Sequence, residues 1–180
     1  MHLQRLNDEV FVASGPIVRL GSEEIDFLKR QAWLSPRRRA RICAHNDDDA
    51  IHEMIIAISS SSYIRPHRHL GKSESFHVVD GSVDIVMFDD DGSITDVVEL
   101  GDRNSGRNFY YRLSESRFHM PLSRADMLVI HEVTNGPFDR DRTVFAPFAP
   151  AEDQVDQVKK YMSEIAASIA RYSGSRKKLP

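Results

Sequence analysis

Short β-type runs separated by tight turns dominate the middle of this 180-residue chain. Glycines and Asp-Gly or Asn-Gly pairs punctuate these runs, and Asp-Gly between β-rich segments is a strong hairpin signal. The predicted strands are His52 to Ser59, Ser62 to Arg68, Glu74 to Asp80, Ser82 to Phe88, Ser93 to Glu99, Arg107 to Arg112, Asp126 to Thr134 and Thr143 to Ala146. Strands of this number and length favour a sandwich or a barrel.

A helix is expected on each side of this β region. After an extended lead-in, Ser22 can cap a helix with apolar residues at helical spacing, and Pro36 should end it near Leu34. An amphipathic helix is predicted from Ala151 to about Tyr172, followed by a basic tail. The predicted organisation is an N-terminal extension and helix (1–42), a barrel (43–150) and a C-terminal helix with its tail (151–180).

Composition favours one globular domain. Hydrophobic residues make up 41% of the chain and charged residues 28%, and a chain of this length buries roughly 70% of its unfolded surface. The 24 basic and 27 acidic residues give a net charge of -3, which argues against a general nucleic-acid binder. No signal peptide or membrane-spanning run is recognised, and the single cysteine excludes an internal disulfide. We therefore expect a cytoplasmic protein without nucleic-acid or membrane partners.

The positions of the 8 histidines are more informative than their number. On a strand, residues two apart point to the same face, so His67 and His69 project together. Glu74 follows after four turn-like residues and can begin the next strand with its carboxylate aimed at the same site. His119, from a later strand that folds back, is the best candidate for a fourth donor. Three imidazole nitrogens and one carboxylate suit Zn, Fe, Mn, Ni or Co and match calcium poorly.

The segment HRHLGKSESFHVVDG resembles the first sequence motif of the cupin superfamily, with His-x-His, four residues, Glu, six residues and Gly81. The neighbouring segments SPRRRAR, SYIRPHRH, GPF and FAPFAP are similar to those of the WbuC family of cupin-fold metalloproteins. This resemblance covers roughly residues 35–152. It implies a mainly β fold, a single small cupin jelly-roll β-barrel with an N-terminal helix and a C-terminal amphipathic helix. It also implies a metal held by His67, His69, Glu74 and His119.

The second cupin motif is less regular. Its usual proline and glycine correspond to Ser114 and Ser116, and its later asparagine to Ser123, while His119 is kept. The turn before this histidine can therefore be built differently. WbuC proteins tend to be associated with surface-polysaccharide and O-antigen gene clusters, so the resemblance implies a small anionic sugar or sugar nucleotide as substrate. Cupin barrels commonly pair, which implies a homodimer.

Arginines and one tyrosine complete the predicted site. The four arginines between positions 37 and 41 form either a solvated surface turn or a group that reaches over the barrel mouth. In the second case Arg37 and Arg39 would bind a phosphate or carboxylate, for which forked guanidinium groups are suited. Tyr63 shares strand parity with the first histidine of the motif, so it is predicted to enter the pocket, either as a packing residue or as a donor to substrate. The catalytic base is predicted to be either a metal-bound hydroxide or Tyr63.

A metal-dependent isomerase or epimerase is the leading functional prediction, with the metal acting as Lewis acid on a substrate carbonyl or hydroxyl. One alternative is an Fe(II)-dependent dioxygenase-type cupin, because the same ligands also support dioxygen chemistry. Another is a non-enzymatic, metal-dependent sugar-binding or regulatory module. The sequence leaves all three open, and the ligand set is compatible with several ions.

Overall fold

The computed structural model describes residues 3–176, with side chains up to Tyr172; the predicted basic tail from Lys177 onward lies outside the described residues. The helices are α1 (Ser22–Leu34) and α2 (Val155–Arg176), and a short 3-10 turn, η1, spans Arg140–Arg142. The strands are β1 (Leu3–Arg5), β2 (Val10–Ala13), β3 (Arg39–Cys43), β4 (Ile51–Ser59), β5 (His67–His69), β6 (Glu74–Asp80), β7 (Ser82–Phe88), β8 (Ile94–Gly101), β9 (Tyr110–Leu113), β10 (Phe118–Ser123), β11 (Met127–Asn135) and β12 (Thr143–Phe145).

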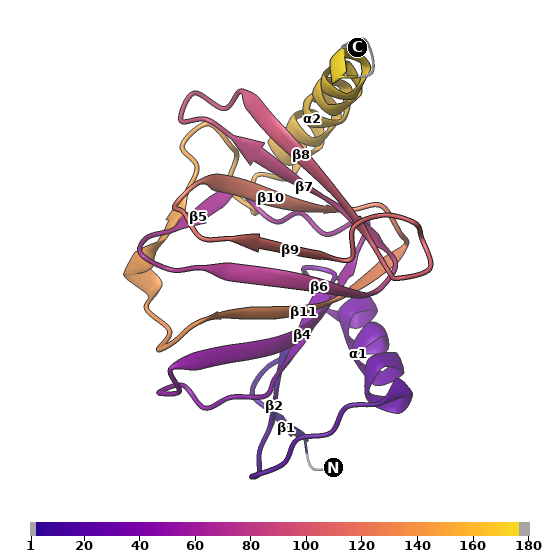
Figure 1. The fold of residues 1–180 in the computed structure, drawn as a ribbon, viewed down its shortest axis with the longest axis vertical. Helices are drawn as coiled ribbons and strands as arrows, with labels where there is room; N and C mark the ends of the chain where they lie inside the picture. The colour runs from indigo at the N-terminus through magenta and orange to yellow at the C-terminus, as the bar shows by residue number, and fades with distance from the viewer. Residues whose placement is uncertain (1–2, 177–180) are drawn as a thin grey trace.

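Two sheets form the barrel (Figure 1). One has the strand order β1-β2-β3-β4-β11-β6-β9 and the other has the order β12-β5-β10-β7-β8. Within the eight strands from β4 to β11, one sheet has the order β4-β11-β6-β9 and the other has the order β5-β10-β7-β8. This is the double-sheet jelly roll, the architecture of cupins. The predicted fold class, a mainly β chain with one small jelly-roll barrel and a helix on either side, is confirmed.

Three apolar clusters hold these layers together. The barrel interior contains residues from both sheets, including Phe76 and Ile130 from one and Ile85 from the other. The outer face of the seven-stranded sheet packs against α1, and the outer face of the five-stranded sheet packs against α2. In Figure 1 the two helices accordingly lie at opposite ends of the stack, α1 low and α2 at the top. Each sheet thus has one face toward the barrel interior and packs on its other face against a helix.

The helix boundaries differ slightly from the predictions. Gly21, not Ser22, occupies the cap position of α1, and its backbone N–H donates to the Glu24 carboxylate over 2.8 Å. Glu24 therefore supplies the capping acceptor that the sequence assigned to the serine. The predicted end at Leu34 is confirmed, because the residue before Pro36 is extended. Helix α2 begins at Val155 and continues to Arg176.

Most predicted strands are present as β4, β6, β7, β8, β9, β11 and β12, but the strand predicted from Ser62 to Arg68 is wrong. Only His67 to His69 pair as β5, and the residues before them are irregular. Pro66 has no N–H to donate, and its carbonyl accepts the backbone N–H of Ala146 over 2.8 Å. The parity argument that placed Tyr63 beside His67 therefore fails, since strand alternation does not extend back to the tyrosine.

Four strands were not predicted, namely β1, β2, β3 and β10. In β3, Ala40 and Ile42 are buried toward α1, and the intervening arginines conceal that alternation in the sequence. In β10, both faces are buried at its beginning, so hydrophobicity does not alternate. Strands β1 to β3 extend the seven-stranded sheet, and the boundary predicted at residues 42 and 43 falls within β3.

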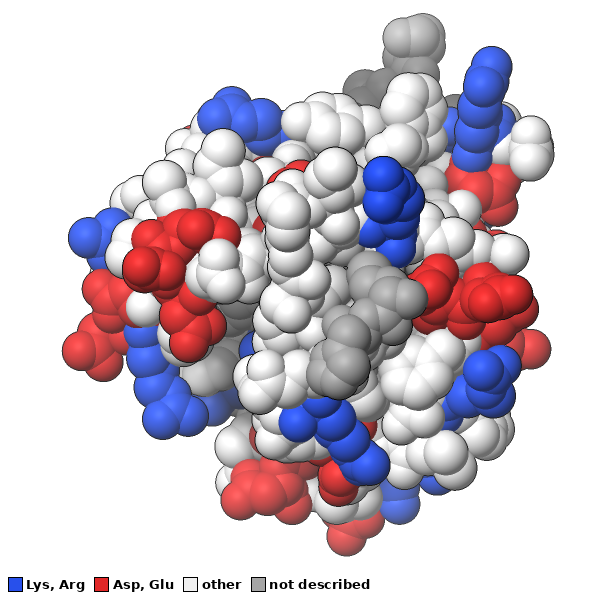
Figure 2. Space-filling model, turned by 90° about the horizontal axis from the view of Figure 1, so that it is seen from below, with Lys and Arg blue, Asp and Glu red and all other residues white. Residues whose placement is uncertain are grey.

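Two further features agree with the sequence. Gly81 joins β6 to β7 with φ of 87°, a left-handed conformation, and an added Cβ would lie 3.0 Å from the carbonyl oxygen of Met127. The face shown in Figure 2 carries acidic and basic side chains interspersed. No helix among the described residues is long and apolar enough to cross a membrane.

Candidate metal centre

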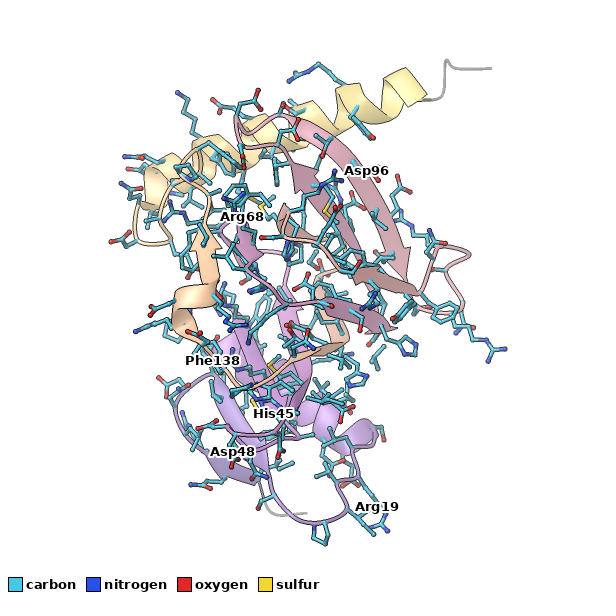
Figure 3. All side chains as sticks on the ribbon, turned by 60° about the vertical axis from the view of Figure 1, so that its left-hand side comes forward. Arg19, His45, Asp48, Arg68, Asp96 and Phe138 are labelled. Carbon is cyan, nitrogen blue, oxygen red and sulfur yellow. The ribbon has the colours of Figure 1, made fainter. Side chains whose placement is uncertain are left out.

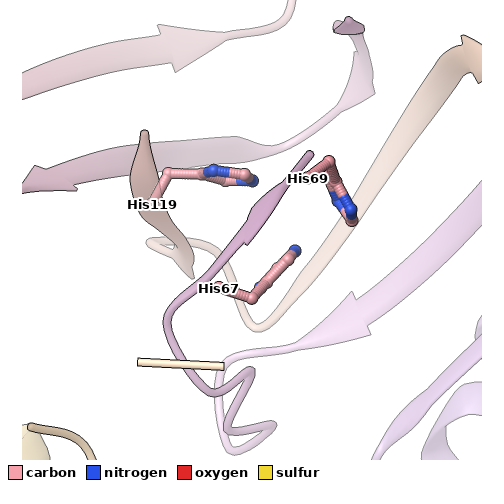
Figure 4. A group of neighbouring side chains, drawn as sticks. All are labelled: His67, His69 and His119. Carbon is pink, nitrogen blue, oxygen red and sulfur yellow. The ribbon is translucent and has the colours of Figure 1, made fainter. Parts of the chain in front are cut away.

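Three histidines meet inside the barrel (Figure 4). His67 and His69 come from β5, and His119 comes from the adjacent strand β10, where it pairs in register with His67. One ring nitrogen from each histidine lies within 4.8 Å of the other two. The structure therefore brings together the three predicted histidines from segments that are far apart in the sequence.

Strand alternation decides where His119 points. Phe118 and Met120 belong to the apolar cluster beneath α2, so the histidine between them faces the opposite way, into the barrel. Its register partner on β7, Met87, belongs to the interior cluster. His119 is only 1% exposed. The pairing of β10 with β5 and β7 fixes the direction of the His119 side chain. The turn before β10 lacks the proline and glycine that are usual in the second cupin motif.

Glu74 approaches the histidines from the other sheet. It is the first residue of β6 and is buried. Its Oε1 lies 2.9 Å from Nε2 of His119, and its Oε2 lies 3.5 Å from Nε2 of His69. Tyr111 of β9 donates its hydroxyl proton to Oε1 over 2.9 Å. Tyr111 also belongs to the interior apolar cluster, and no local sequence pattern indicates its bond to Glu74.

The outer nitrogen of each imidazole already has a partner. Nδ1 of His67 and Nδ1 of His119 lie 2.9 and 3.0 Å from the carbonyl oxygen two residues earlier. Nδ1 of His69 lies 3.2 Å from Oγ1 of Thr143. An imidazole that donates from Nδ1 presents a lone pair at Nε2, and metal-binding histidines usually have such an outer partner. All three rings are therefore arranged to offer Nε2 to a common centre.

Nε2 of His119 provides a test of whether a cation fits. It lies 2.9 Å from Oε1 of Glu74, which as a carboxylate oxygen has no proton to donate, and no described residue donates a hydrogen bond to this buried nitrogen. A buried polar atom without a partner costs about 1–3 kcal/mol. A divalent ion coordinated by Nε2 would remove that cost, and three imidazoles with one carboxylate suit a first-row transition metal. The residues present fit such an ion.

The electrostatics of the metal-free site are consistent with this fit. Burial, together with His119 and His69, lowers the pKa of His67 to about 3, and burial also lowers the pKa of His69. Burial alone would raise the pKa of Glu74, but the adjacent His119 lowers it to about 2. The pKa of His119 is raised by the Glu74 carboxylate in spite of burial. In the metal-free site, a proton on His119 thus balances the negative charge of the Glu74 carboxylate. A bound metal ion would balance that charge instead.

A second carboxyl group faces the barrel interior. Glu132 of β11 pairs in register with Phe76 and shares the face of Ile130, both of which belong to the interior cluster. Burial and the nearby Glu74 carboxylate raise the pKa of Glu132 to about 8. The sequence analysis missed this residue. The available signal was an acidic side chain at a core-facing position of a correctly predicted strand.

Tyr63 makes its contacts in a different layer. Its ring belongs to the apolar cluster beneath α2 and lies 6.3 Å from the ring of Tyr161. Its hydroxyl donates to the carbonyl oxygen of Pro150 over 3.0 Å, and burial raises its pKa. These contacts tie the segment before β5 to the start of α2, which is a structural role. The catalytic role of Tyr63 stays a prediction.

Arg37 and Arg39 are paired with carboxylates. Nε of Arg37 donates to both carboxylate oxygens of Glu9, over 3.0 and 2.8 Å. Nη2 of Arg39 lies 2.8 Å from Oε1 of Glu152, and its Nη1 donates to the carbonyl oxygen of Tyr63. The network connects residues before β2, in β3 and before α2. The substrate-binding role of the two arginines stays a prediction, and their guanidinium groups are engaged with these partners.

The arginine between the two histidines of β5 faces outward, as its parity predicts. Arg68 lies 4.4 Å above the ring of Phe118 and pairs with Asp90 over 3.0 Å (Figure 3). With these residues it lines a cavity of about 490 Å³ that also includes Glu115 and Arg117. Because Phe118 belongs to the cluster beneath α2, this cavity lies outside the barrel interior.

The remaining strand histidines also lie outside the three-histidine group. His77 has the opposite strand parity to Glu74; it is exposed, and its ring lies 5.4 Å from the ring of Phe109. His52 is buried and stacks on His45 with ring centroids 3.9 Å apart. His131 lies 3.5 Å from the Glu53 carboxylate. None of these four belongs to the cluster of described residues able to hold a metal.

Comparison with known proteins gives partial resemblances. Residues 20–100 match the model of a family described as a domain of unknown function, DUF6016. No curated protein matches the chain.

Several solved structures are similar in part. A Thermus thermophilus protein shares 13% identity over 62% of this chain and 92% of its own, with a TM-score of 0.47. A Shewanella oneidensis protein shares 14% identity over 56% of this chain, with a TM-score of 0.46, and this chain spans 65% of its length. Oxalate decarboxylase from Bacillus subtilis shares 14% identity over 54% of this chain and 24% of its own, with a TM-score of 0.44.

Proposed function

We propose that this chain is a metal-binding cupin protein in which His67, His69, Glu74 and His119 hold one divalent transition-metal ion. The observation that carries the proposal is that one ring nitrogen of each histidine lies within 4.8 Å of the other two, with Nε2 of His69 and His119 beside the buried Glu74 carboxylate, while every Nδ1 atom has a partner. An arrangement in which only the inner nitrogens are available is what a metal requires of histidine.

Metal analysis tests this proposal directly. Protein purified from its native host should contain one equivalent of a transition metal, and His67→Ala should lose it together with thermal stability. His77→Ala is the matched control, because that ring is exposed and lies outside the cluster. A wild-type protein that carries no stoichiometric metal, and whose metal content and melting temperature do not respond to His67→Ala, would contradict the proposal.

The proposed activity is isomerisation or epimerisation of a small anionic sugar or sugar nucleotide in surface-polysaccharide biosynthesis. Its support is the resemblance of residues 35–152 to the WbuC family, together with a ligand set that leaves room for substrate. When bound, the ion supplies a Lewis acid for an oxyanion developing on the substrate. Glu132 is an interior carboxyl group available to transfer a proton, and its burial raises its pKa toward the range that is useful for acid–base catalysis.

A panel of sugar nucleotides and sugar phosphates, incubated with metal-loaded protein in deuterated water, tests the activity. Incorporation of solvent deuterium at one carbon, measured by NMR, is the expected result. Oxygen consumption in the presence of Fe(II) would instead favour the dioxygenase-type alternative. A ligand that binds and is recovered unchanged, without deuterium, would favour the sugar-binding or regulatory module.

The proposal also includes a homodimer in the cytoplasm. Pairing is common among cupin barrels, and the buried free thiol of Cys43 suits a reducing compartment. Sedimentation velocity should give twice the mass of the chain, and a monomer at micromolar concentration would contradict the dimer.

A further inference from the structure

Two of the four arginines before the barrel, Arg37 and Arg39, pair with carboxylates, whereas among the described residues Arg38 and Arg41 do not. Arg37 and Arg39 belong to the network above. Arg38 donates to the carbonyl oxygen of Trp33, and its guanidinium lies 5.5 Å above that ring. Arg41 has an exposed side chain and no ion pair with any residue of the described part of the chain. Its charge is therefore not neutralised by a paired acid.

Arg41 also differs from the others in the side of the sheet that it faces. Its neighbours along β3, Ala40 and Ile42, are buried in the cluster beneath α1. Alternation sends Arg41 to the opposite face, which is the barrel side. Its register partner on β4, Ile56, packs against the interior cluster. Arg41 therefore stands at the edge of the barrel, on the same face as the interior side chains.

Two groups of the interior face respond to this charge. Burial raises the pKa of Cys43 and of Glu132, and in both cases Arg41 counteracts the increase. Cys43 and Glu132 occupy one row across the sheet, because each pairs in register with Met54. Arg41 is two residues from Cys43 on the same face of β3. Glu132 pairs in register with the residue of β6 that is two positions after Glu74 on the same face. This row therefore lies between Arg41 and Glu74 on the interior face of the sheet.

A guanidinium in this position suits an oxyanion. Its forked donors match the geometry of carboxylate and phosphate, and it remains charged at all physiological pH values. A small substrate could place one oxygen at the histidines and its anionic group at Arg41. These two contacts, at opposite ends of the substrate, would fix its orientation. We propose that Arg41 binds the carboxylate or phosphate group of the substrate, the role that the sequence analysis gave to Arg37 and Arg39. This inference rests on the proposed function.

Anion titration of the full-length protein tests the inference. Metal-loaded wild type and Arg41→Gln are titrated separately with inorganic phosphate and with acetate by calorimetry. We expect Arg41→Gln to weaken binding of the preferred anion at least 10-fold, and the stronger of the two probes in wild type identifies the anionic group. Arg19→Gln is the matched control, because Arg19 is exposed in the loop before α1, far from Arg68 and the neighbouring β5 (Figure 3).

The possible outcomes separate this inference from the proposed function. Equal affinities of wild type and Arg41→Gln, or no anion binding by wild type, would overturn the role of Arg41 whatever the metal content. Equal losses in Arg41→Gln and Arg19→Gln would also overturn it, because they indicate a general charge effect. Absence of metal from wild type would overturn the proposed function, and the same titrations on the metal-free protein would then still decide the role of Arg41.

Discussion

The histidines of β5 and the arginines before β4 both form dense clusters in the sequence, but the two clusters have different surroundings in the structure. His67 and His69 are two residues apart on one strand, so their rings share a face and are joined there by His119. The arginines span a turn and the beginning of β3, and Arg38 has a positive φ of 56°. Consecutive guanidinium groups therefore leave in different directions. A cluster of like residues forms one site only where the backbone gives its members a common face.

The two clusters also differ in the groups that balance their charges and satisfy their hydrogen bonds. The arginine network is neutralised by Glu9 and Glu152, which approach from distant parts of the chain. The histidines have one carboxylate, Glu74, and a buried Nε2 without a hydrogen bond. The first arrangement is complete as a structural element, whereas the second would be completed by the cation that we propose. The following substitutions test this contrast, beginning with the largest expected effect.

Replacing His119 by Gln should have the largest effect, on metal binding. The variant removes a ligand nitrogen that is fully enclosed, so we expect metal affinity to fall by more than about 100-fold, beyond the loss typical of an outer-sphere partner. Competition with a chromogenic chelator measures the change. If the variant binds metal as tightly as wild type, the centre consists of β5 and β6 alone, and the contribution of β10 must be abandoned.

Glu132, which lies between the two clusters, should make stability depend on pH in the metal-free protein. Its pKa is raised from 4.5 to about 8 on folding, so between these values the unfolded chain releases the proton that the folded protein retains. Stability is therefore lost as pH rises through this window, and Glu132→Gln should become more stable than wild type by on the order of 2 kcal/mol near pH 8. Urea unfolding at pH 5 and pH 8 measures this difference, and a constant difference between the two proteins would refute it.

Tyr111→Phe should have a smaller effect. It removes the hydroxyl that orients Glu74 but leaves the packed ring in place. We expect metal affinity to fall about 10-fold, at the lower end of the range for groups that orient a ligand. Tyr110→Phe is the control, because that tyrosine is half exposed on the adjacent position of β9. Equal affinities of the two variants would show that Glu74 does not need the hydroxyl.

Arg37→Gln should have the smallest effect. The Arg37 side chain is 54% exposed, so its ion pair with Glu9 is largely screened by solvent and its loss should cost about 1 kcal/mol or less. Metal content should be unchanged. Chemical unfolding and metal analysis of the same preparation measure both quantities. A loss of metal would show that the arginine network is coupled to the histidine cluster and would break the contrast between them.

Local sequence patterns predicted the elements in which hydrophobicity follows burial in a simple way, either alternating or uniformly apolar. Strands β6, β7 and β11 alternate or are uniformly apolar between clear turns, and α1 ends where Pro36 requires it. The strand β10 was missed because Phe118 is buried against α2 while His119 is buried in the barrel. A strand enclosed on both sides has no period of two in its hydrophobicity. Tyr63 was misplaced for a related reason, since a parity argument requires a continuous strand.

The β-rich architecture and the spacing that puts two histidines on one face could be read from the sequence, whereas the set of four candidate ligands stays a prediction drawn from the family resemblance. The first two follow from local geometry, because strand alternation acts over two residues and turn preferences over four. Only the tertiary structure decided which partners complete the site: Tyr111 beside Glu74, Glu132 in the interior, and carboxylates for Arg37 and Arg39 but not for Arg41. Such partners depend on the strand order of two sheets and on register between distant segments, which no local pattern specifies.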